Sequence, residues 1–131
     1  MELTYNCLRE TLIMLEKKLE LNDDFEFKPL GIHEIASYSE ITSKYESNEI
    51  AYCVYMLADS GLIKILPCGD WVRELQVLTL TYKGHEFLKQ IANDTVWNKI
   101  MKALQPIGAI SISIISKTAE IIIKEYITSN L

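Results

Sequence analysis

The stretch from Ser47 to Leu66 (SNEIAYCVYMLADSGLIKIL) restricts the possible folds of this chain more than any other segment. Its apolar residues recur at helical spacing and predict one buried stripe, made by Ile50, Val54, Leu57 and Ala58. Ser47 is expected to cap the helix, because a serine hydroxyl can accept a hydrogen bond from the free backbone N–H groups of the first turn. Gly61 is expected to end it, since glycine adopts the left-handed conformation without strain. A strand should then begin at Leu62.

The residues that follow predict a second strand and another helix. Segment 76–81 (QVLTLT) has the alternating pattern of a strand. Val77 and Thr79 would lie on one face, and Leu78 and Leu80 on the other. A turn is expected at Gly69-Asp70, between the two strands. Segment 82–91 then reads as a helix. This succession of helix, strand, turn, strand and helix is typical of a winged helix-turn-helix core.

Further helices are predicted on both sides of this core. Leucines at helical spacing predict a first helix over 8–19, ended by the polar run 22–24. Segment 31–39 (GIHEIASYS) fits either a short helix or a strand, and both remain open. Asp94 or Thr95 should cap a later helix, which ends before Pro106. The last helix should begin at Ser111 or Ser113, and its many isoleucines require support from packing.

The length and composition fit one folded domain with a substantial core. The chain has 131 residues, of which 49% are hydrophobic. We therefore expect an α+β fold, with a winged helix-turn-helix core and extra C-terminal helices. Residues 1–106 would form the winged-helix-like domain. Residues 107–131 would form a C-terminal helix that packs on the domain or forms a dimer.

Two phrases of the sequence carry a family resemblance. The run 48–63, ending in Ser60-Gly61-Leu62-Ile63, resembles the "helix, then L-x-x-x-G-L-I" of winged-helix regulators. The run 80–88 resembles their "L-T-x-x-G-x-x-F-L" step from wing strand to helix. With GDW at 69–71 and NDTVWNK at 93–99, roughly residues 3–127 resemble an uncharacterised family of small winged-helix-like proteins of bacteria and their prophages. The resemblance implies a fold and a mobile-element context, and it implies no activity.

The distribution of charge weighs against nucleic acid as the main ligand. The formal net charge is −5, and residues 1–66 carry twelve Asp and Glu against six Lys and Arg. The helix that would read DNA lies in this acidic half. It contains Glu49 and Asp59 and no Lys or Arg between Ser47 and Gly61. Affinity for phosphate comes mainly from lysine and arginine, so this helix is a weak reader of DNA.

Two binding functions follow from these patterns. The first is a non-enzymatic regulator that binds DNA and controls transcription. The alternative is a protein–protein interaction module with an acidic helix face that carries tyrosines and binds no DNA. Asn48 could read adenine, and tyrosines can contact sugar or phosphate or anchor a protein interface. The candidate contact residues for either partner are Asn48, Tyr52, Tyr55, Arg73, Lys44 and Lys83.

The last helix is a candidate for homodimerisation. Its isoleucines are spread around the helix and are not confined to a single stripe. One face can therefore pack on the domain, while another apolar face still needs to be covered. A second copy is one solution, and the candidate residues are Ile115, Ile122, Ile123 and Tyr126. The alternative is a helix packed against the leucines of the first helix within one chain.

No pattern of residues predicts an enzyme, a cofactor or a metal site. The two histidines, His33 and His85, have no partners at ligand spacing. Cys7, Cys53 and Cys68 are far apart, which favours free thiols in a reducing cytosol. The N-terminal residues do not resemble a secretory signal, and segment 107–123 is too polar for a membrane span. We therefore expect a cytoplasmic protein that does not contact a membrane.

Overall fold

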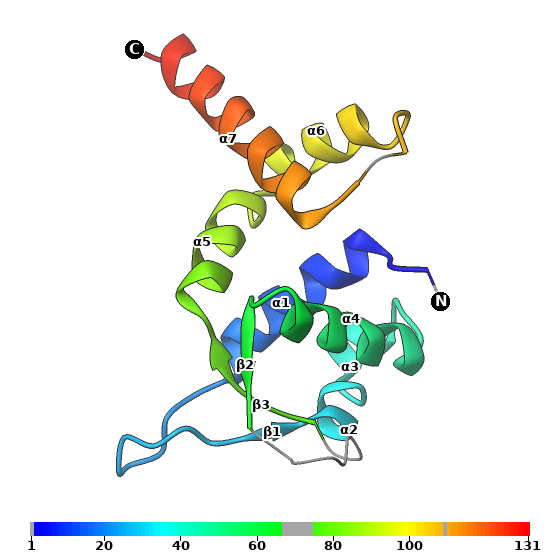
Figure 1. Ribbon diagram of the computed structural model, residues 1–131, viewed down its shortest axis with the longest axis vertical. Coiled ribbons are helices and arrows are strands. Elements are labelled where there is room, and N and C mark those ends of the chain that lie inside the picture. The colour runs from blue at the N-terminus through cyan, green and yellow to red at the C-terminus, as the bar shows by residue number, and fades with distance from the viewer. Residues whose placement is uncertain (1, 67–74, 109) are drawn as a thin grey trace. The chain divides into compact units, whose positions relative to one another are not determined.

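The computed structural model describes residues 2–66, 75–108 and 110–131 (Figure 1). Within these ranges the chain forms seven helices and a three-stranded antiparallel sheet. The expected mixed α+β class is therefore confirmed. The chain divides into two compact units, Met1–His85 and Glu86–Leu131. This division lies earlier in the chain than the predicted one after residue 106.

Helices and strands follow one another in an order close to the predicted one. The elements are α1 (Tyr5–Lys18), β1 (Leu30–Gly31), α2 (Ile32–Ile35), α3 (Ser39–Thr42), α4 (Ser47–Asp59), β2 (Ile63–Ile65), β3 (Gln76–Leu80), α5 (Tyr82–Ile91), α6 (Asp94–Leu104) and α7 (Ile112–Ser129). The open choice at 31–39 resolves as a short helix, α2. The predicted turn at Gly69-Asp70 lies outside the described residues.

The core of the first unit forms where α1 packs against α4. The leucines of α1 and three of the four predicted stripe residues of α4 are fully buried: Leu8, Leu12, Leu15, Ile50, Val54 and Leu57. Ala58, the fourth, is half-buried. Burial of these side chains is the main force that holds the two helices together.

The sheet of the first unit has the order β1-β3-β2. β3 pairs antiparallel with both neighbours, through Leu30 opposite Val77 and Ile63 opposite Leu80. An irregularity between Lys64 and Ile65 shifts the register of the β2–β3 pair. Strands far apart in the sequence thus become neighbours, and β3 occupies the centre.

The start of α4 differs from the expected cap. Glu46 occupies the N-cap position without a side-chain cap bond, and Ser47 is the first helical residue. The Ser47 hydroxyl instead donates to the Ala36 carbonyl oxygen at 3.1 Å. Ala36 closes α2, where the last carbonyls have no partner within their own helix. Ser47 therefore ties α4 to the preceding helix, and the predicted cap was wrong.

The second unit contains α6 and α7, which pack against each other. α6 has Asn93 as its N-cap, one residue before either predicted cap, because the Asn93 side chain accepts a hydrogen bond from the Val96 N–H at 3.0 Å. Ser111, one of the two predicted starts of the last helix, is the N-cap of α7, and its side chain accepts a hydrogen bond from the Ile114 N–H at 3.1 Å. No helix in the described ranges has the length and apolar character needed to cross a bilayer.

Candidate functional site

Two adjoining backbone hydrogen bonds end α4 at Gly61, as the sequence predicts. Gly61 has φ +77°. The Gly61 N–H donates to the Ala58 carbonyl oxygen at 3.1 Å. The Leu62 N–H donates to the Leu57 carbonyl oxygen at 2.9 Å. This pair of bonds is the Schellman arrangement, in which the residue after the C-cap adopts a left-handed conformation. The chain leaves α4 sharply and enters β2.

The start of α5 closes onto this helix end. The Thr81 hydroxyl donates to the Gly61 carbonyl oxygen at 2.6 Å and accepts from the Gly84 N–H at 3.0 Å. The Thr81 N–H donates to the Leu62 carbonyl oxygen at 3.0 Å. A Cβ atom on Gly84 would overlap that same carbonyl oxygen. The two sequence phrases that carry the family resemblance therefore pack directly against each other and fix the end of α4.

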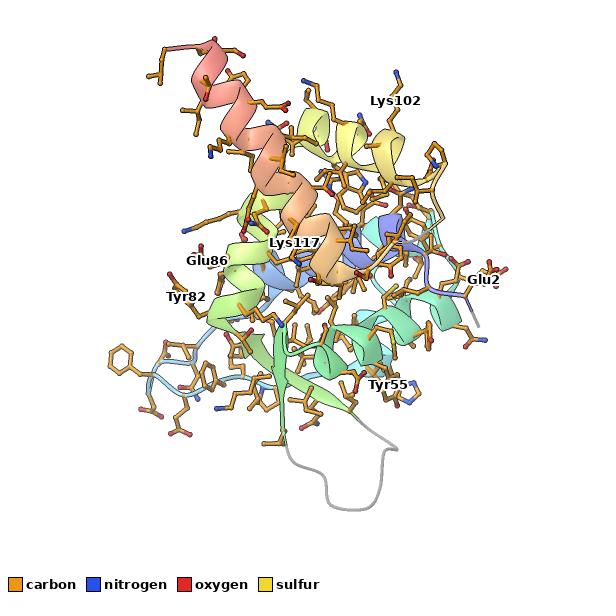
Figure 2. All side chains as sticks on the ribbon, turned by 45° about the horizontal axis from the view of Figure 1, so that its top comes forward. Glu2, Tyr55, Tyr82, Glu86, Lys102 and Lys117 are labelled. Atoms are coloured by element: carbon orange, nitrogen blue, oxygen red, sulfur yellow. The ribbon has the colours of Figure 1, made fainter. Side chains whose placement is uncertain are left out.

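The accessible face of α4 is acidic and aromatic. Asn48 is exposed, whereas Tyr52 and Tyr55 are half-buried. Figure 2 shows Tyr55 on this helix. The helix has Glu49 in its first turn and no basic residue in its last. Asn48 is therefore the best-placed of the three predicted contact residues.

The lysines predicted to support this face have other partners. Lys44 Nζ lies 2.7 Å from Glu10 Oε1 in an ion pair. Lys83 Nζ donates to the Ser60 carbonyl oxygen at 3.2 Å, at the end of α4. The remaining predicted cation, Arg73, lies outside the described residues. Each of these two lysines beside α4 thus already has a partner within the chain.

The ion pair at Lys44 belongs to a small polar network beside α1. Burial alone would raise the pKa of Glu10, but hydrogen bonds from Lys44 and Tyr45 outweigh it, so this pKa lies below its ordinary value. Burial and the bond to Glu10 raise the pKa of Tyr45. The network therefore favours an ionised carboxylate and a neutral phenol.

Two buried thiols lie between α1 and α4. Cys7 and Cys53 are both free and have exposed fractions of 0% and 1%. A hydrogen bond with Cys7, together with burial, raises the pKa of the Cys53 thiol. A thiol needs access and a lowered pKa to act as a nucleophile. Cys53 is therefore a packing residue.

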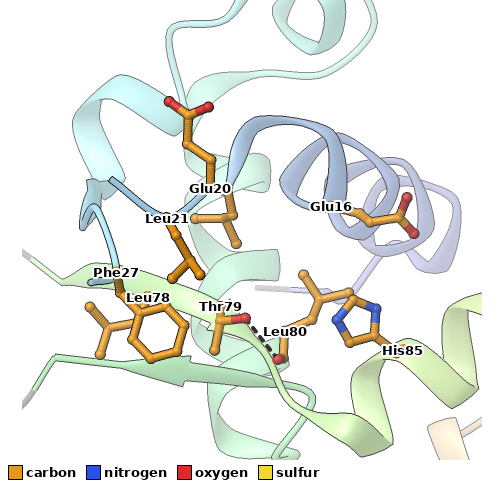
Figure 3. Close-up of a pocket in the computed structure, with 9 residues that line it drawn as sticks. Glu16, Glu20, Leu21, Phe27, Leu78, Thr79, Leu80 and His85 are labelled. Carbon is orange, nitrogen blue, oxygen red and sulfur yellow. Dashed lines mark hydrogen bonds between the residues drawn. The ribbon is translucent and has the colours of Figure 1, made fainter. Parts of the chain in front are cut away.

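A pocket of about 270 Å³ opens between the end of α1 and the middle of β3 (Figure 3). Its lining is mainly apolar, with two glutamates and a histidine: Glu16, Leu19, Glu20, Leu21, Phe27, Leu78, Thr79, Leu80 and His85. In Figure 3, Leu21, Phe27 and Leu78 point toward one another. All of these residues belong to the first unit. None of them except His85 stood out in the sequence as a functional candidate.

A tight hairpin adjoins this pocket and was missed by the sequence patterns. Leu21 pairs with Phe27 across it. The Asn22 side chain accepts hydrogen bonds from the N–H groups of Asp24 at 2.9 Å and Glu26 at 3.0 Å. The run Asn22-Asp23-Asp24 predicts the end of a helix, and it is equally a turn signal. Because Phe25 and Phe27 follow it at alternate positions, the run could have indicated a hairpin.

The predicted dimer residues occupy different surroundings in the second unit. Ile115 is fully buried, so it packs within the chain. Ile122, Ile123 and Tyr126 line a pocket of about 400 Å³ with residues from the end of α5 and from α6. Tyr126 is 67% exposed. Of the four residues, Tyr126 offers the most surface to a second copy.

Metal-binding clusters do not occur in the part of the chain that the structure describes. Both histidines, His33 and His85, are exposed. His85 shares the lining of the α1–β3 pocket with Glu16. Two such side chains alone do not make a metal site, which needs more ligands.

Comparisons with known proteins identify a family without an assigned activity. The model of the family described as "Hypothetical protein (DUF2513)" matches residues 2–111. An "Uncharacterized protein" of Haemophilus influenzae is 30% identical over 84 residues, which cover 62% of this chain and 70% of that relative. No solved structure matches the chain.

Proposed function

The chain belongs to the DUF2513 family of hypothetical proteins, and for this member we propose the role of a non-enzymatic regulatory protein of winged-helix type. The order of the elements supports this assignment. α1, β1, α2, α3 and α4 precede the β2–β3 pair, and the sheet order is β1-β3-β2. In DNA-binding helix-turn-helix domains the helix in the position of α4 lies in the major groove of DNA. The prophage origin belongs to the same proposal and rests on the sequence resemblance.

The partner that we propose for α4 is a protein, and the charge of this helix carries the proposal. Its sequence from Ser47 to Asp59 contains two acidic residues and no basic one. Lys44 is held by Glu10, and Lys83 is held by the Ser60 carbonyl oxygen. Nonspecific DNA affinity comes from lysines and arginines that displace counterions from phosphate. A half-buried tyrosine with a polar tip suits a protein interface instead.

Duplex DNA is the second candidate, as the ligand of a transcription regulator. The observation that favours it is the exposed position of Asn48 in the first turn of α4. Asparagine can form two hydrogen bonds with adenine in the major groove. In this alternative, Asn48 would read the base and the tyrosines would contact the backbone.

Binding to random duplex DNA at about 50 mM salt separates the two candidates, since nonspecific affinity is greatest at low salt. We expect no mobility shift with the wild-type chain. A charge-reversed variant, Asp59→Lys with Glu49→Lys, serves as the positive control because it gives α4 the cations that it lacks. Wild-type binding to random DNA that weakens as salt increases would establish DNA as the ligand instead.

The protein partner is tested by comparing single charge reversals. A partner captured by the wild-type chain should be lost with Asp59→Lys, which changes α4. It should be retained with Glu125→Lys, a matched reversal on α7 in the other unit. Equal retention by both variants would remove α4 from the interface.

A further inference from the structure

The hairpin 20–28 presents an unusual amount of apolar surface to solvent. Leu21 is 50% exposed, Phe25 85% and Phe27 46%. Single exposed apolar residues are common on soluble proteins, whereas a contiguous group marks an interaction site. Here the group continues into the pocket between α1 and β3, which Leu21 and Phe27 help to line (Figure 3). We call these residues and the pocket the hairpin surface.

Phe25 occupies a conformation that its side chain does not favour. Its φ is +62°, and it is the one non-glycine residue with positive φ among those that the structure describes. The turn is fixed around it, because Asn22 bonds with both Asp24 and Glu26. Glycine or asparagine would adopt this conformation more readily than phenylalanine. The exposed ring therefore opposes stability, and intramolecular packing gives no reason for it.

The size of the pocket points to one inserted side chain. Pockets for small molecules generally measure about 300–1,000 Å³. At about 270 Å³, the pocket lies just below that range. Its floor is leucine and phenylalanine, with Leu80 largely buried. This small and mainly apolar space suits an apolar side chain of a partner.

The charge around the pocket specifies the partner further. Glu16 lines the pocket itself, and Asp23, Asp24 and Glu26 lie on the hairpin. In the ranges that the structure describes, none of these four carboxylates forms an ion pair. Glu20 is the exception on this surface, because Lys28 Nζ lies 2.9 Å from it. The apolar surface is thus bordered by four carboxylates that form no ion pair in the described ranges, and by the Glu20–Lys28 pair.

We propose that the hairpin surface binds a basic segment of another protein. An apolar side chain of that segment enters the space between Leu21, Phe27 and Leu78. Lysine or arginine residues next to it meet Glu16 and the acidic residues of the hairpin. This proposal uses different residues from those on α4, so it stands whether α4 binds protein or DNA.

Selection from a displayed library of random twelve-residue peptides tests the proposal with the full chain. The peptides selected on the wild-type chain should pair lysine or arginine with leucine or phenylalanine. They should be lost on Phe27→Ser and weakened as salt increases, because the border of the site is charged. Asn98→Ser, at an exposed position of α6, is the matched control and should retain them. Selected peptides without basic residues, or equal retention on Phe27→Ser, would overturn the proposal.

Phe25→Gly provides a second test, in which weaker binding cannot be explained by a destabilised fold. The variant should unfold at a higher urea concentration than the wild type, because glycine relieves the backbone strain. It should nevertheless bind the selected peptides at least tenfold more weakly. Unchanged binding would show that the ring has no part in recognition. If light scattering shows that the hairpin surface pairs two copies of the chain, with Phe27→Ser monomeric, the basic partner is excluded.

Discussion

At Gly84 the backbone of α5 approaches Leu62 so closely that no side chain fits between them. Thr81 strengthens this approach, since its hydroxyl bonds with both Gly61 and Gly84. The glycine is therefore required by a neighbouring carbonyl group and not by an unusual φ. At Gly61 the reason is different, because φ there is +77° and the surrounding space is open.

Gly84→Ala should destabilise the fold by about 2–3 kcal/mol, because the new methyl group forces the two backbone segments apart. Gly31→Ala is the matched control. Gly31 has φ −73°, and no atom lies within 4 Å of the position that a Cβ would take there, so alanine should be neutral or stabilise by up to about 1 kcal/mol. Urea denaturation of both variants measures the difference. Equal midpoints would contradict the close approach.

Among the elements, α1 and the segment before α4 are joined by two ion pairs, Lys18 with Glu40 and Lys44 with Glu10. Glu10 of α1 accepts hydrogen bonds from Lys44 and Tyr45. The carboxylate is partly exposed, so solvent weakens the attraction between these charges. The contact is still directional, because two donors meet one acceptor. It orients the chain just before α4 begins.

The lowered pKa of Glu10 makes this contact dependent on pH. A carboxyl group whose pKa is lowered by folding stabilises the native state above its ordinary value of 4.5. That contribution is lost as pH falls through the folded-state pKa. Glu10→Gln should therefore show a shallower loss of stability than the wild type between about pH 6 and pH 3. Thermal unfolding across this pH range measures the stability of each variant, with Glu16→Gln as the control. Parallel curves of stability against pH for Glu10→Gln and the wild type would refute the expectation.

Long helices were predictable from the sequence, and short elements were not. α1, α4 and α7 repeat apolar residues over several turns, so their burial follows from spacing. α2 and α3 have four residues each, too few for a period to appear. Capping was uncertain for another reason. Asn93, Asp94 and Thr95 all suit an N-cap, and only the fold decides that Asn93 takes that position.

Parts of the candidate site were likewise predictable from the sequence, and other parts were not. The phrases around Gly61 and Thr81 were visible because their residues are adjacent along the chain. The hairpin surface was not, because Leu21, Phe27 and Leu78 meet only after the hairpin lies beside β3. The partners of Lys44 and Lys83 were also invisible, since each comes from a distant part of the sequence.

For the whole molecule, charge is separated between the two units. Residues 1–85 contain fourteen Asp and Glu against eight Lys and Arg, whereas residues 86–131 contain four against five. A basic partner would be drawn toward the first unit, most strongly at low salt. The nearly neutral second unit lacks such a field, so its exposed isoleucines and tyrosine are better suited to contact with another copy.

The dimer proposed from the sequence can be tested at Tyr126, which is exposed and lines a pocket. Light scattering should give the wild-type chain about twice its mass of 15.0 kDa at high concentration. Tyr126→Glu should reduce this to the single-chain mass, since a buried carboxylate without a partner is unfavourable. Asn98→Glu, an exposed change on α6, should leave the dimer intact. A single-chain mass for the wild type at all concentrations would exclude the dimer.

Phe25 has a consequence for how this protein changes over evolutionary time. A residue that weakens its own fold can be replaced by a stabilising one without harm, unless function retains it. In a lineage that lost the partner of the hairpin, position 25 would be free to become glycine or asparagine, and the core would be unaffected. The residue at this position in other family members would then record which of them still meet that partner.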